Sequence, residues 1–95
     1  MVDCNVINGE LVCRFPARLD TQACSAMEAG LKEKLDATAE PAVFDLAGVT
    51  FISSMFLRIC LTHYKQRGKA GFALRNISPD VKKVFMVAGF GEMLA

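Results

Sequence analysis

Apolar residues in this chain follow two different spacings, which separate predicted strands from predicted helices. Apolar and polar residues alternate over residues 2–7, and the alternation resumes over residues 11–15. Asn8 and Gly9 stand between the two runs, and both tolerate the positive φ angles of a tight hairpin turn. The pattern predicts a β-hairpin that ends at Pro16, because proline has no N–H to donate to a neighbouring strand.

A helical spacing follows the hairpin over residues 21–35. Asp20 or Thr21 can cap the start of this helix by accepting a hydrogen bond from its first turn. The face that we expect to pack on a sheet holds Ala23, Met27, Leu31 and Leu35. Gly30 lies inside the helix and costs about 1 kcal/mol relative to alanine. We therefore expect a neighbouring element to approach the helix closely at Gly30.

The central stretch begins after Pro41 with the run AVFDLAGVTFI over residues 42–52. Only Asp45 and Thr50 interrupt its apolar character, which is typical of a strand buried on both faces, as in a parallel sheet. We therefore expect a buried strand, a loop, and then a helix that begins near Met55.

The helix after Met55 has apolar positions three and four residues apart, which define its expected buried face. These positions are Leu57, Cys60, Leu61 and Tyr64, whereas Arg58, His63, Lys65 and Arg67 fall toward another face. Gly68 follows at the position of a helix C-cap.

The last part of the chain predicts a short strand over residues 71–75 and one more helix. Ser78 is the expected N-cap, and Pro79 is the first helical residue. The expected buried stripe of this helix is Val81, Val84, Phe85 and Ala88. Beyond Gly89, the residues Phe90, Met93 and Leu94 either fold back as an apolar anchor or begin a final strand.

This order of elements predicts an α/β fold with a mixed β-sheet and helices packed mainly on one side. The 95 residues suffice for a single domain over 1–95 with one core. A formal net charge of +1 gives no reason to expect binding to nucleic acid or to a membrane surface. The longest uncharged stretch, residues 46–57, is too short to cross a bilayer. The N-terminus lacks the features of a signal peptide, so we expect a cytoplasmic protein.

Catalysis and metal binding have little support in the composition. The cysteines form no C-x-x-C pair, and His63 is the one histidine. We expect the four cysteines, Cys4, Cys13, Cys24 and Cys60, to stay reduced and to pack as small apolar residues. No phosphate-binding glycine loop is present, and His63 has no evident partner for acid–base chemistry. The chain is therefore expected to be no enzyme and to hold no metal.

Two serines stand at the start of the central helix. Either Ser53 or Ser54 can cap it, because a serine hydroxyl accepts a hydrogen bond from a free N–H of the first turn. Capping needs only one serine. A phosphate on the other would face several N–H donors and the positive end of the helix dipole, which would stabilise it.

The stretch FDLAGVTFISSMFLRICLTHYKQRGKAGFALRNISPDVKKVFMVAGF resembles the STAS domain of bacterial anti-sigma factor antagonists. That family has a strand, D-L-S-x-V, an apolar pair, D-S-[ST]-G-L and a helix, then a strand ending near S-P-x-V and a short helix closing in G-[LF]. The resemblance extends more weakly over nearly the whole chain. It aligns Ser54 with the family's phosphoacceptor serine. This chain departs from the family at Ser53, where aspartate is usual, and at Phe56, where glycine is usual.

The resemblance also covers residues 17–20, which are similar to the family's strand-to-helix turn, usually G-x-[LI]-D. It implies that Asp20 lies beside the Ser54 loop, although a simple role as N-cap explains Asp20 equally well. The partner surface would be the start of the central helix and the loops beside it. There we expect Ser54, Met55, Phe56 and Arg58 to be exposed or half exposed, with Phe56 as an aromatic interface anchor unless it packs under the Asp20 loop.

The function that the resemblance implies is that of an anti-sigma factor antagonist, a phosphorylation-controlled protein-binding switch. Its unphosphorylated form would bind an anti-sigma factor with serine kinase activity, and phosphorylation of Ser54 would end the binding. The partner would supply ATP, so no cofactor is expected. Ser53 and the bulk of Phe56 predict slow phosphorylation.

Two alternatives remain open. One is a STAS-like module that is never phosphorylated and binds constitutively in a larger signalling or lipid-transport assembly. The other is a structural or dimerising domain, which rests on the hydrophobic fraction of 53%. We expect a monomer or a weak dimer.

Overall fold

A four-stranded sheet forms the centre of the structure, a computed structural model that describes residues 2–94. β1 (Asp3–Ile7) and β2 (Glu10–Arg14) pair antiparallel, and β4 (Ala42–Asp45) and β6 (Phe72–Arg75) follow in parallel, in the order β1-β2-β4-β6. Asn8 and Gly9 both adopt positive φ angles, 51° and 78°, in the hairpin turn. The predicted hairpin and the predicted mixed sheet are both confirmed.

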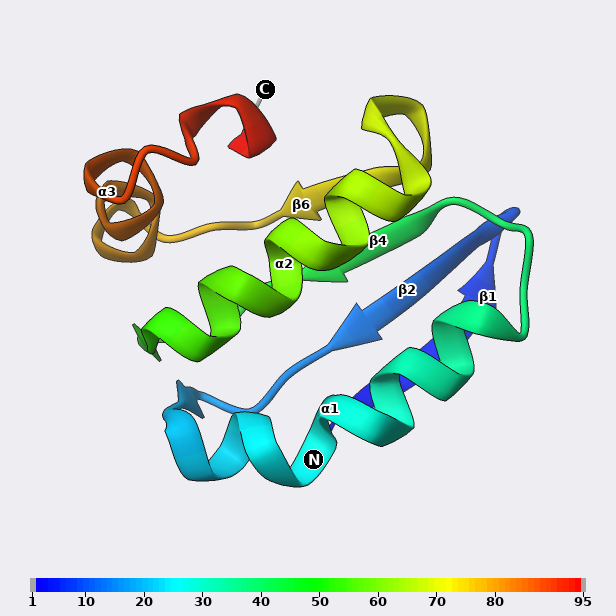
Figure 1. The fold of residues 1–95 in the computed structure, drawn as a ribbon, viewed down its shortest axis with the longest axis horizontal. Coiled ribbons are helices and arrows are strands. Elements are labelled where there is room, and N and C mark those ends of the chain that lie inside the picture. Colours follow the sequence, from blue (N-terminus) through cyan, green and yellow to red (C-terminus); the bar gives the residue numbers. More distant parts are fainter. Residues whose placement is uncertain (1, 95) are drawn as a thin grey trace.

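Two long helices cover one face of this sheet. α1 (Thr21–Asp36) and α2 (Ser54–Arg67) lie side by side on it, while α3 (Pro79–Val87) lies beyond the end of β6 (Figure 1). The core fills the space between this face and the helices, and its fully buried side chains include Cys13, Leu31, Phe44, Phe56 and Phe85. Among the described residues, no helix is long and apolar enough to span a membrane.

A second, smaller sheet pairs β3 (Arg18–Leu19) with β5 (Phe51–Ile52) in parallel. The sequence predicted a single buried strand over residues 42–52, and that prediction is wrong because β4 ends at Asp45. The chain then turns, with Gly48 at a φ of 81° and the Val49 N–H bonded to the Leu46 carbonyl at 3.0 Å. Leu46 and Val49 are buried within this turn, so their apolar character resembles that of a strand.

Asp45 holds this turn next to the one that follows β6. Its carboxylate accepts hydrogen bonds from the Ala47 N–H at 3.1 Å and from the Asn76 side chain at 3.0 Å. The hydrogen bond from Asn76 is the main cause that lowers the pKa of the Asp45 carboxyl below its ordinary value, although burial opposes it. The carboxylate therefore stays charged and keeps both turns in place at neutral pH.

The buried faces of the two long helices differ from the prediction. In α1 the buried residues are Cys24, Met27, Leu31 and Leu35, and Ala23 is half buried. Gly30 is exposed, and a Cβ there would meet no atom within 4 Å, so the expected close approach is wrong. In α2 the buried residues are Phe56, Leu57, Ile59, Cys60 and His63. This helix packs on the sheet and on α1, which buries a broader arc than one stripe.

His63 and Arg67 therefore do not lie on an exposed polar face. His63 packs edge-on against Phe44, with ring centroids 6.2 Å apart. The Arg67 guanidinium donates to the carbonyls of Leu35, at 3.0 Å, and of Thr38 and Glu40. It thereby ties the end of α2 to the end of α1 and to the chain that leads into β4.

In the C-terminal part, the predicted N-cap of the last helix is confirmed, but its predicted buried face is partly wrong. The Ser78 hydroxyl accepts a hydrogen bond from the Val81 N–H at 3.3 Å, and Pro79 is the first residue of α3. Val81 and Phe85 are buried, but Val84 and Ala88 are exposed. A short 3-10 helix, η2 (Gly91–Leu94), buries Met93 and folds back as an anchor in place of a strand.

Candidate functional site

The N-termini of α1 and α2 lie next to each other because the small sheet leads into both helices. Leu19 of β3 pairs with Ile52 of β5, and the Ser53 N–H donates to the Leu19 carbonyl at 2.9 Å. The next residue of each chain segment is a helix cap. Asp20 therefore lies beside the loop that carries Ser53 and Ser54, as the family resemblance implied.

Each cap uses its side chain in the same way. The Asp20 carboxylate accepts a hydrogen bond from the Ala23 N–H at 2.8 Å, and the Ser53 hydroxyl accepts one from the Phe56 N–H at 3.4 Å. Ser53 is thus the N-cap of α2, and Ser54 is its first residue. Because Ser53 performs the capping, the exposed Ser54 has no need to do so.

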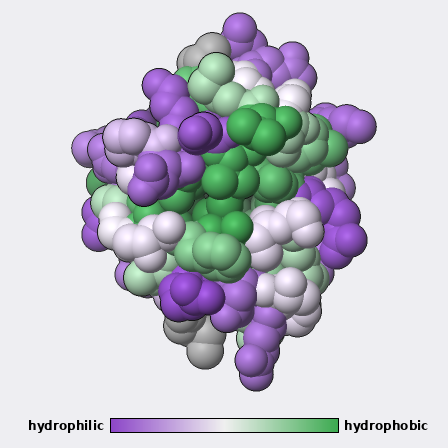
Figure 2. Space-filling model, turned by 90° about the vertical axis from the view of Figure 1, so that its left-hand side faces the viewer, coloured by the Kyte–Doolittle hydropathy of each residue, from purple (hydrophilic) through white to green (hydrophobic). Residues whose placement is uncertain are grey.

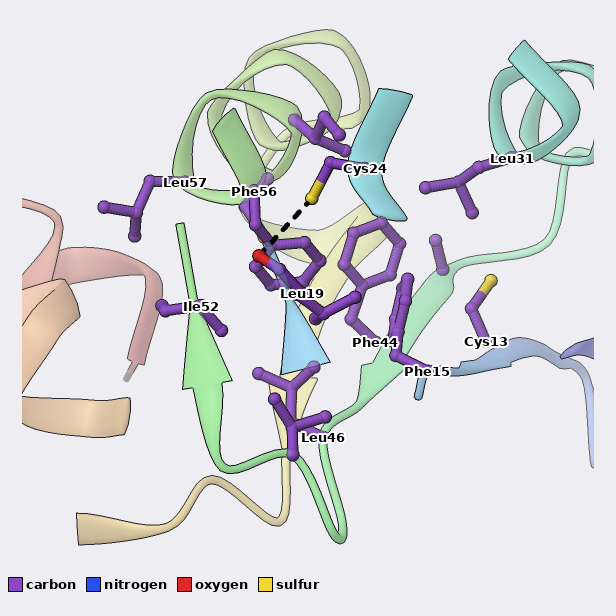
Figure 3. Close-up of a cluster of buried hydrophobic side chains, with 14 of the residues drawn as sticks. Cys13, Phe15, Leu19, Cys24, Leu31, Phe44, Leu46, Ile52, Phe56 and Leu57 are labelled. Atoms are coloured by element: carbon purple, nitrogen blue, oxygen red, sulfur yellow. Dashed lines mark hydrogen bonds between the residues drawn. The ribbon is translucent and has the colours of Figure 1, made fainter. Parts of the chain in front are cut away.

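Side chains of α1 also contact the start of α2 directly. The Cys24 thiol lies 3.7 Å from the Ser53 hydroxyl and 3.7 Å from the Leu19 carbonyl, the second contact being the dashed line in Figure 3. Burial raises the pKa of the Cys24 thiol, so this thiol is neutral at pH 7. The hydroxyl of the next residue, Ser25, lies 3.5 Å from the Met55 sulfur. These contacts hold the two helix starts in a fixed relation.

Phe56 does not belong to the expected partner surface, because its side chain is 0% exposed. It points into the core, where its ring lies edge-on to Phe15 with centroids 5.3 Å apart and also packs on Phe44 (Figure 3). The expectation of an exposed aromatic anchor at Phe56 is therefore wrong. Burial of a large ring stabilises the fold, and the first turn of α2 directs this position toward Phe15 and Phe44.

The other predicted surface residues are accessible. Ser54 and Arg58 are exposed, and Met55 is half exposed. Ser54 and Arg58 are four residues apart, so they are neighbours on one face of α2. The N-terminus of a helix carries partial positive charge, and Arg58 adds a full positive charge one turn away. The surroundings of the Ser54 hydroxyl therefore suit a negatively charged group.

An exposed apolar area lies on the same side of the molecule as the start of α2. α3 and β5 contact each other there, and they expose Phe51, Val84, Met86 and Val87. Figure 2 shows apolar side chains gathered on this face. The residues Asp80, Lys83, Val84, Val87 and Ala88 line a shallow hollow on α3. The Arg18 guanidinium lies 4.7 Å from the centre of the Phe51 ring.

This area was not expected from the sequence, because the helical spacing placed Val84 in the buried stripe of the last helix. One signal was present, since α3 has Val81, Val84, Phe85, Met86 and Val87 within nine residues. So short a helix cannot turn all of these side chains toward one core. Among residues 2–94, no three His, Cys, Asp or Glu side chains are grouped so that they could hold a metal ion.

Comparison with known proteins identifies the family. The chain matches the STAS domain family over residues 1–94. It belongs to the STAS domain family. No curated protein sequence matches this STAS domain.

Solved structures of anti-sigma factor antagonists share its fold. The unphosphorylated anti-sigma factor antagonist SpoIIAA has a TM-score of 0.81 and 22% identity over 100% of this chain and 86% of that one. An anti-sigma-factor antagonist (STAS) domain protein from Planctomyces limnophilus has a TM-score of 0.83 and 24% identity, over 98% and 85%. An anti-sigma factor antagonist from Mycobacterium paratuberculosis has a TM-score of 0.86 and 21% identity, over 99% and 81%.

Proposed function

We propose that this STAS domain is an anti-sigma factor antagonist that binds an anti-sigma factor with serine kinase activity, and that phosphorylation of Ser54 ends the binding. The observation that carries the proposal is the position of Ser54. It is an exposed serine in the first turn of α2, and its neighbour Ser53 already serves as the cap. Ser54 is therefore free to be modified without loss of a structural hydrogen bond.

The electrostatics at Ser54 support a switch that acts on the surface and leaves the fold intact. A phosphoserine adds roughly two negative charges at neutral pH. At Ser54 this charge would face the positive end of the α2 dipole, and Arg58 lies within reach one turn away. The phosphorylated domain is thus expected to keep its structure, so that the change is felt by the partner.

Exposed apolar side chains on the same side of the molecule as Ser54 would supply the contact that the phosphate breaks. Met55 is half exposed, and Phe51, Val84 and Val87 expose 42%, 41% and 79% of their surface. Exposed apolar clusters of this kind are typical of protein-interaction sites. A partner bound there would exclude water from Ser54. The free-energy cost of dehydrating a phosphate on Ser54 would then oppose binding. SpoIIAA, to which this domain is similar, has been solved in phosphorylated and unphosphorylated forms.

Ser53 remains the reason to expect slow phosphorylation. Its hydroxyl is held by the Phe56 N–H, and it lacks the charge of the aspartate usual in the family. Phe56 no longer contributes to this expectation, because its side chain points away from the surface and does not cover Ser54. The partner would bring the ATP, so the domain itself needs no cofactor.

Phosphopeptide mapping with the cognate kinase and ATP tests the proposal. We expect label on Ser54, no label in Ser54→Ala, and faster labelling in Ser53→Asp, which restores the carboxylate and can still cap α2. Label on Ser53 would overturn the assignment of the acceptor. A binding assay with Val87→Asp should show weaker association, whereas Lys65→Asp, an exposed change of charge near the far end of α2, should bind as the unmodified protein does.

The second candidate is a constitutive STAS interaction module in a larger signalling or lipid-transport assembly. The observation that favours it is the absence of the carboxylate at Ser53. Binding to a partner that is lost in Val87→Asp, combined with no label on any serine, would favour this candidate over the switch.

A further inference from the structure

Two cysteines face each other across the hairpin at the edge of the sheet. Cys4 of β1 is the direct partner of Cys13 of β2 in the antiparallel register. Residues that are direct partners in a ladder project to the same face of the sheet. Both cysteines are free thiols, and Cys4 packs against the same core that contains Cys13.

The position of the pair within the ladder favours a covalent bond. Ile7 and Glu10 flank the two-residue turn and therefore form a hydrogen-bonded pair. Hydrogen-bonded and non-hydrogen-bonded pairs alternate along an antiparallel ladder, so Cys4 and Cys13, three pairs further on, form a non-hydrogen-bonded pair. Such pairs have Cα atoms about 4.5 Å apart, which lies within the range of roughly 4.4 to 6.8 Å found in disulfides.

The two thiols differ in their access to solvent. Cys13 is 0% exposed, whereas Cys4 is half buried and lines a hollow between β1 and α1 together with Glu33 and Lys34. Burial, and next the adjacent Cys4 thiol, raise the pKa of the Cys13 thiol far above its ordinary value. A reagent from solution therefore meets Cys4 first, and Cys13 reacts only with what is bound to Cys4.

Although the sequence led us to expect that all four cysteines stay reduced, we propose that Cys4 and Cys13 form a reversible dithiol–disulfide pair that small-molecule disulfides oxidise, with Cys4 reacting first and Cys13 resolving. In the first step the Cys4 thiolate attacks one sulfur of the small disulfide, which forms a mixed disulfide and releases one small thiolate. In the second step Cys13 gives up its proton and its sulfur attacks the Cys4 sulfur, which releases the second small thiol. Two protein thiols are oxidised, and one small disulfide is reduced to two thiols.

The bond would fasten an exposed edge strand to the core. Among residues 2–94, no strand pairs with the outer side of β1, and most of the side chains of β1 are exposed. Its only covalent connection to β2 at present is the Asn8–Gly9 turn. A disulfide near the open end of the hairpin would close it, so that β1 opens less often and its amide hydrogens exchange more slowly.

Incubation with oxidised glutathione followed by alkylation, trypsin digestion and mass spectrometry tests the pair. The tryptic peptide that ends at Arg14 contains both Cys4 and Cys13, so their disulfide appears as the loss of two hydrogen atoms within one peptide. Cys24 and Cys60 lie on other peptides and serve as internal controls, which we expect to remain reduced. Reduction with dithiothreitol should restore both thiols.

Single variants separate the two roles. Cys13→Ser should accumulate one glutathione on Cys4, and Cys4→Ser should take up none, because the remaining Cys13 is buried. Circular dichroism of both variants shows whether they fold. In the unmodified protein, a stable glutathione adduct on Cys4 without closure, a dimer linked through Cys4, or no reaction at Cys4 would each overturn the proposal. Slower hydrogen exchange confined to β1 and β2 in the oxidised protein is the expected structural effect, and unchanged exchange there would also contradict it.

Discussion

Ser53 and Ser54 are adjacent and chemically identical, yet the structure gives them different tasks. We expect Ser53→Ala to lower the free energy of unfolding by about 0.5 to 2 kcal/mol, because the Phe56 N–H loses its cap. Ser54→Ala should change it by less than about 0.5 kcal/mol, as is usual at exposed positions. Urea denaturation measures both values. Equal losses in the two variants would show that the cap is shared.

His63 predicts a dependence of stability on pH. Burial lowers the pKa of His63 below its ordinary value of about 6.5, with Arg67 and Lys32 acting in the same direction and Asp36 and Glu28 opposing. As the pH falls below about 6.5, the unfolded chain therefore takes up a proton that the folded protein resists. The contribution of neutral His63 to the free energy of unfolding is fully present above that pH. It decreases as the pH falls toward the pKa that His63 has in the folded protein.

Urea denaturation at several pH values between 7.5 and 5 tests this dependence. One proton allows the free energy of unfolding to change by at most about 1.4 kcal/mol per pH unit. His63→Gln has no titrating side chain, so its stability should be lower at pH 7.5 but flatter over this range. Asp36 and Asp45 both have a lowered pKa, so their contributions are lost at more acid pH. A slope unchanged in His63→Gln would assign it to another group.

At the scale of single elements, α1 contains one residue, Gly30, whose replacement should stabilise the helix. Gly30 is exposed in mid-helix, with open space where a Cβ would lie. We expect Gly30→Ala to raise the free energy of unfolding by about 1 kcal/mol, the difference in helix propensity. Gly89→Ala is the matched control, because it also has open space but a φ of 85°. It should destabilise by about 1 to 2 kcal/mol, the cost of a left-handed conformation with a side chain. A gain in both variants would contradict this account.

Arg67 joins the C-terminal ends of the two long helices. Its guanidinium donates to three backbone carbonyls, those of Leu35, Thr38 and Glu40. We expect Arg67→Ala to lower the free energy of unfolding by roughly 1.5 to 3 kcal/mol, as for hydrogen bonds that involve a charged group. Lys65→Ala, an exposed change on the same turn of the helix, should have an effect below about 0.5 kcal/mol. Equal effects of Arg67→Ala and Lys65→Ala on the free energy of unfolding would mean that water replaces the guanidinium as hydrogen-bond donor to these carbonyls.

At the scale of the whole molecule, one core joins the elements. Side chains from β2, β4, β6 and all three α-helices belong to a single buried cluster. We expect one cooperative thermal transition, with the same midpoint by circular dichroism and by tyrosine fluorescence at Tyr64. Separate midpoints would indicate more than one folding unit. Size-exclusion chromatography should show a monomer or a weak dimer, and a tight dimer would assign the exposed apolar area on α3 to self-association.

The sequence by itself determined the local elements of this protein. The Asn8–Gly9 turn, the Ser78–Pro79 helix start and the motif around Ser54 each depend on neighbouring residues and on the backbone angles that those residues allow. The mixed sheet could be predicted because alternating and helical spacings identify which elements follow one another. The STAS fold was implied by the resemblance of the motif around Ser54 to that family. These signals are short in range, and nothing far away in the chain changed them.

Only the tertiary structure decided which side chains of each element face the core. Because α2 packs against both the sheet and α1, Phe56 and His63 are buried and Arg67 is half buried. Val84 of α3, by contrast, is exposed. The break of residues 42–52 into β4, a turn and β5 likewise depends on pairing with Arg18 and Leu19, more than thirty residues earlier than β5. Helical spacing identifies an apolar stripe but not how many neighbours surround it, and burial is determined by those neighbours.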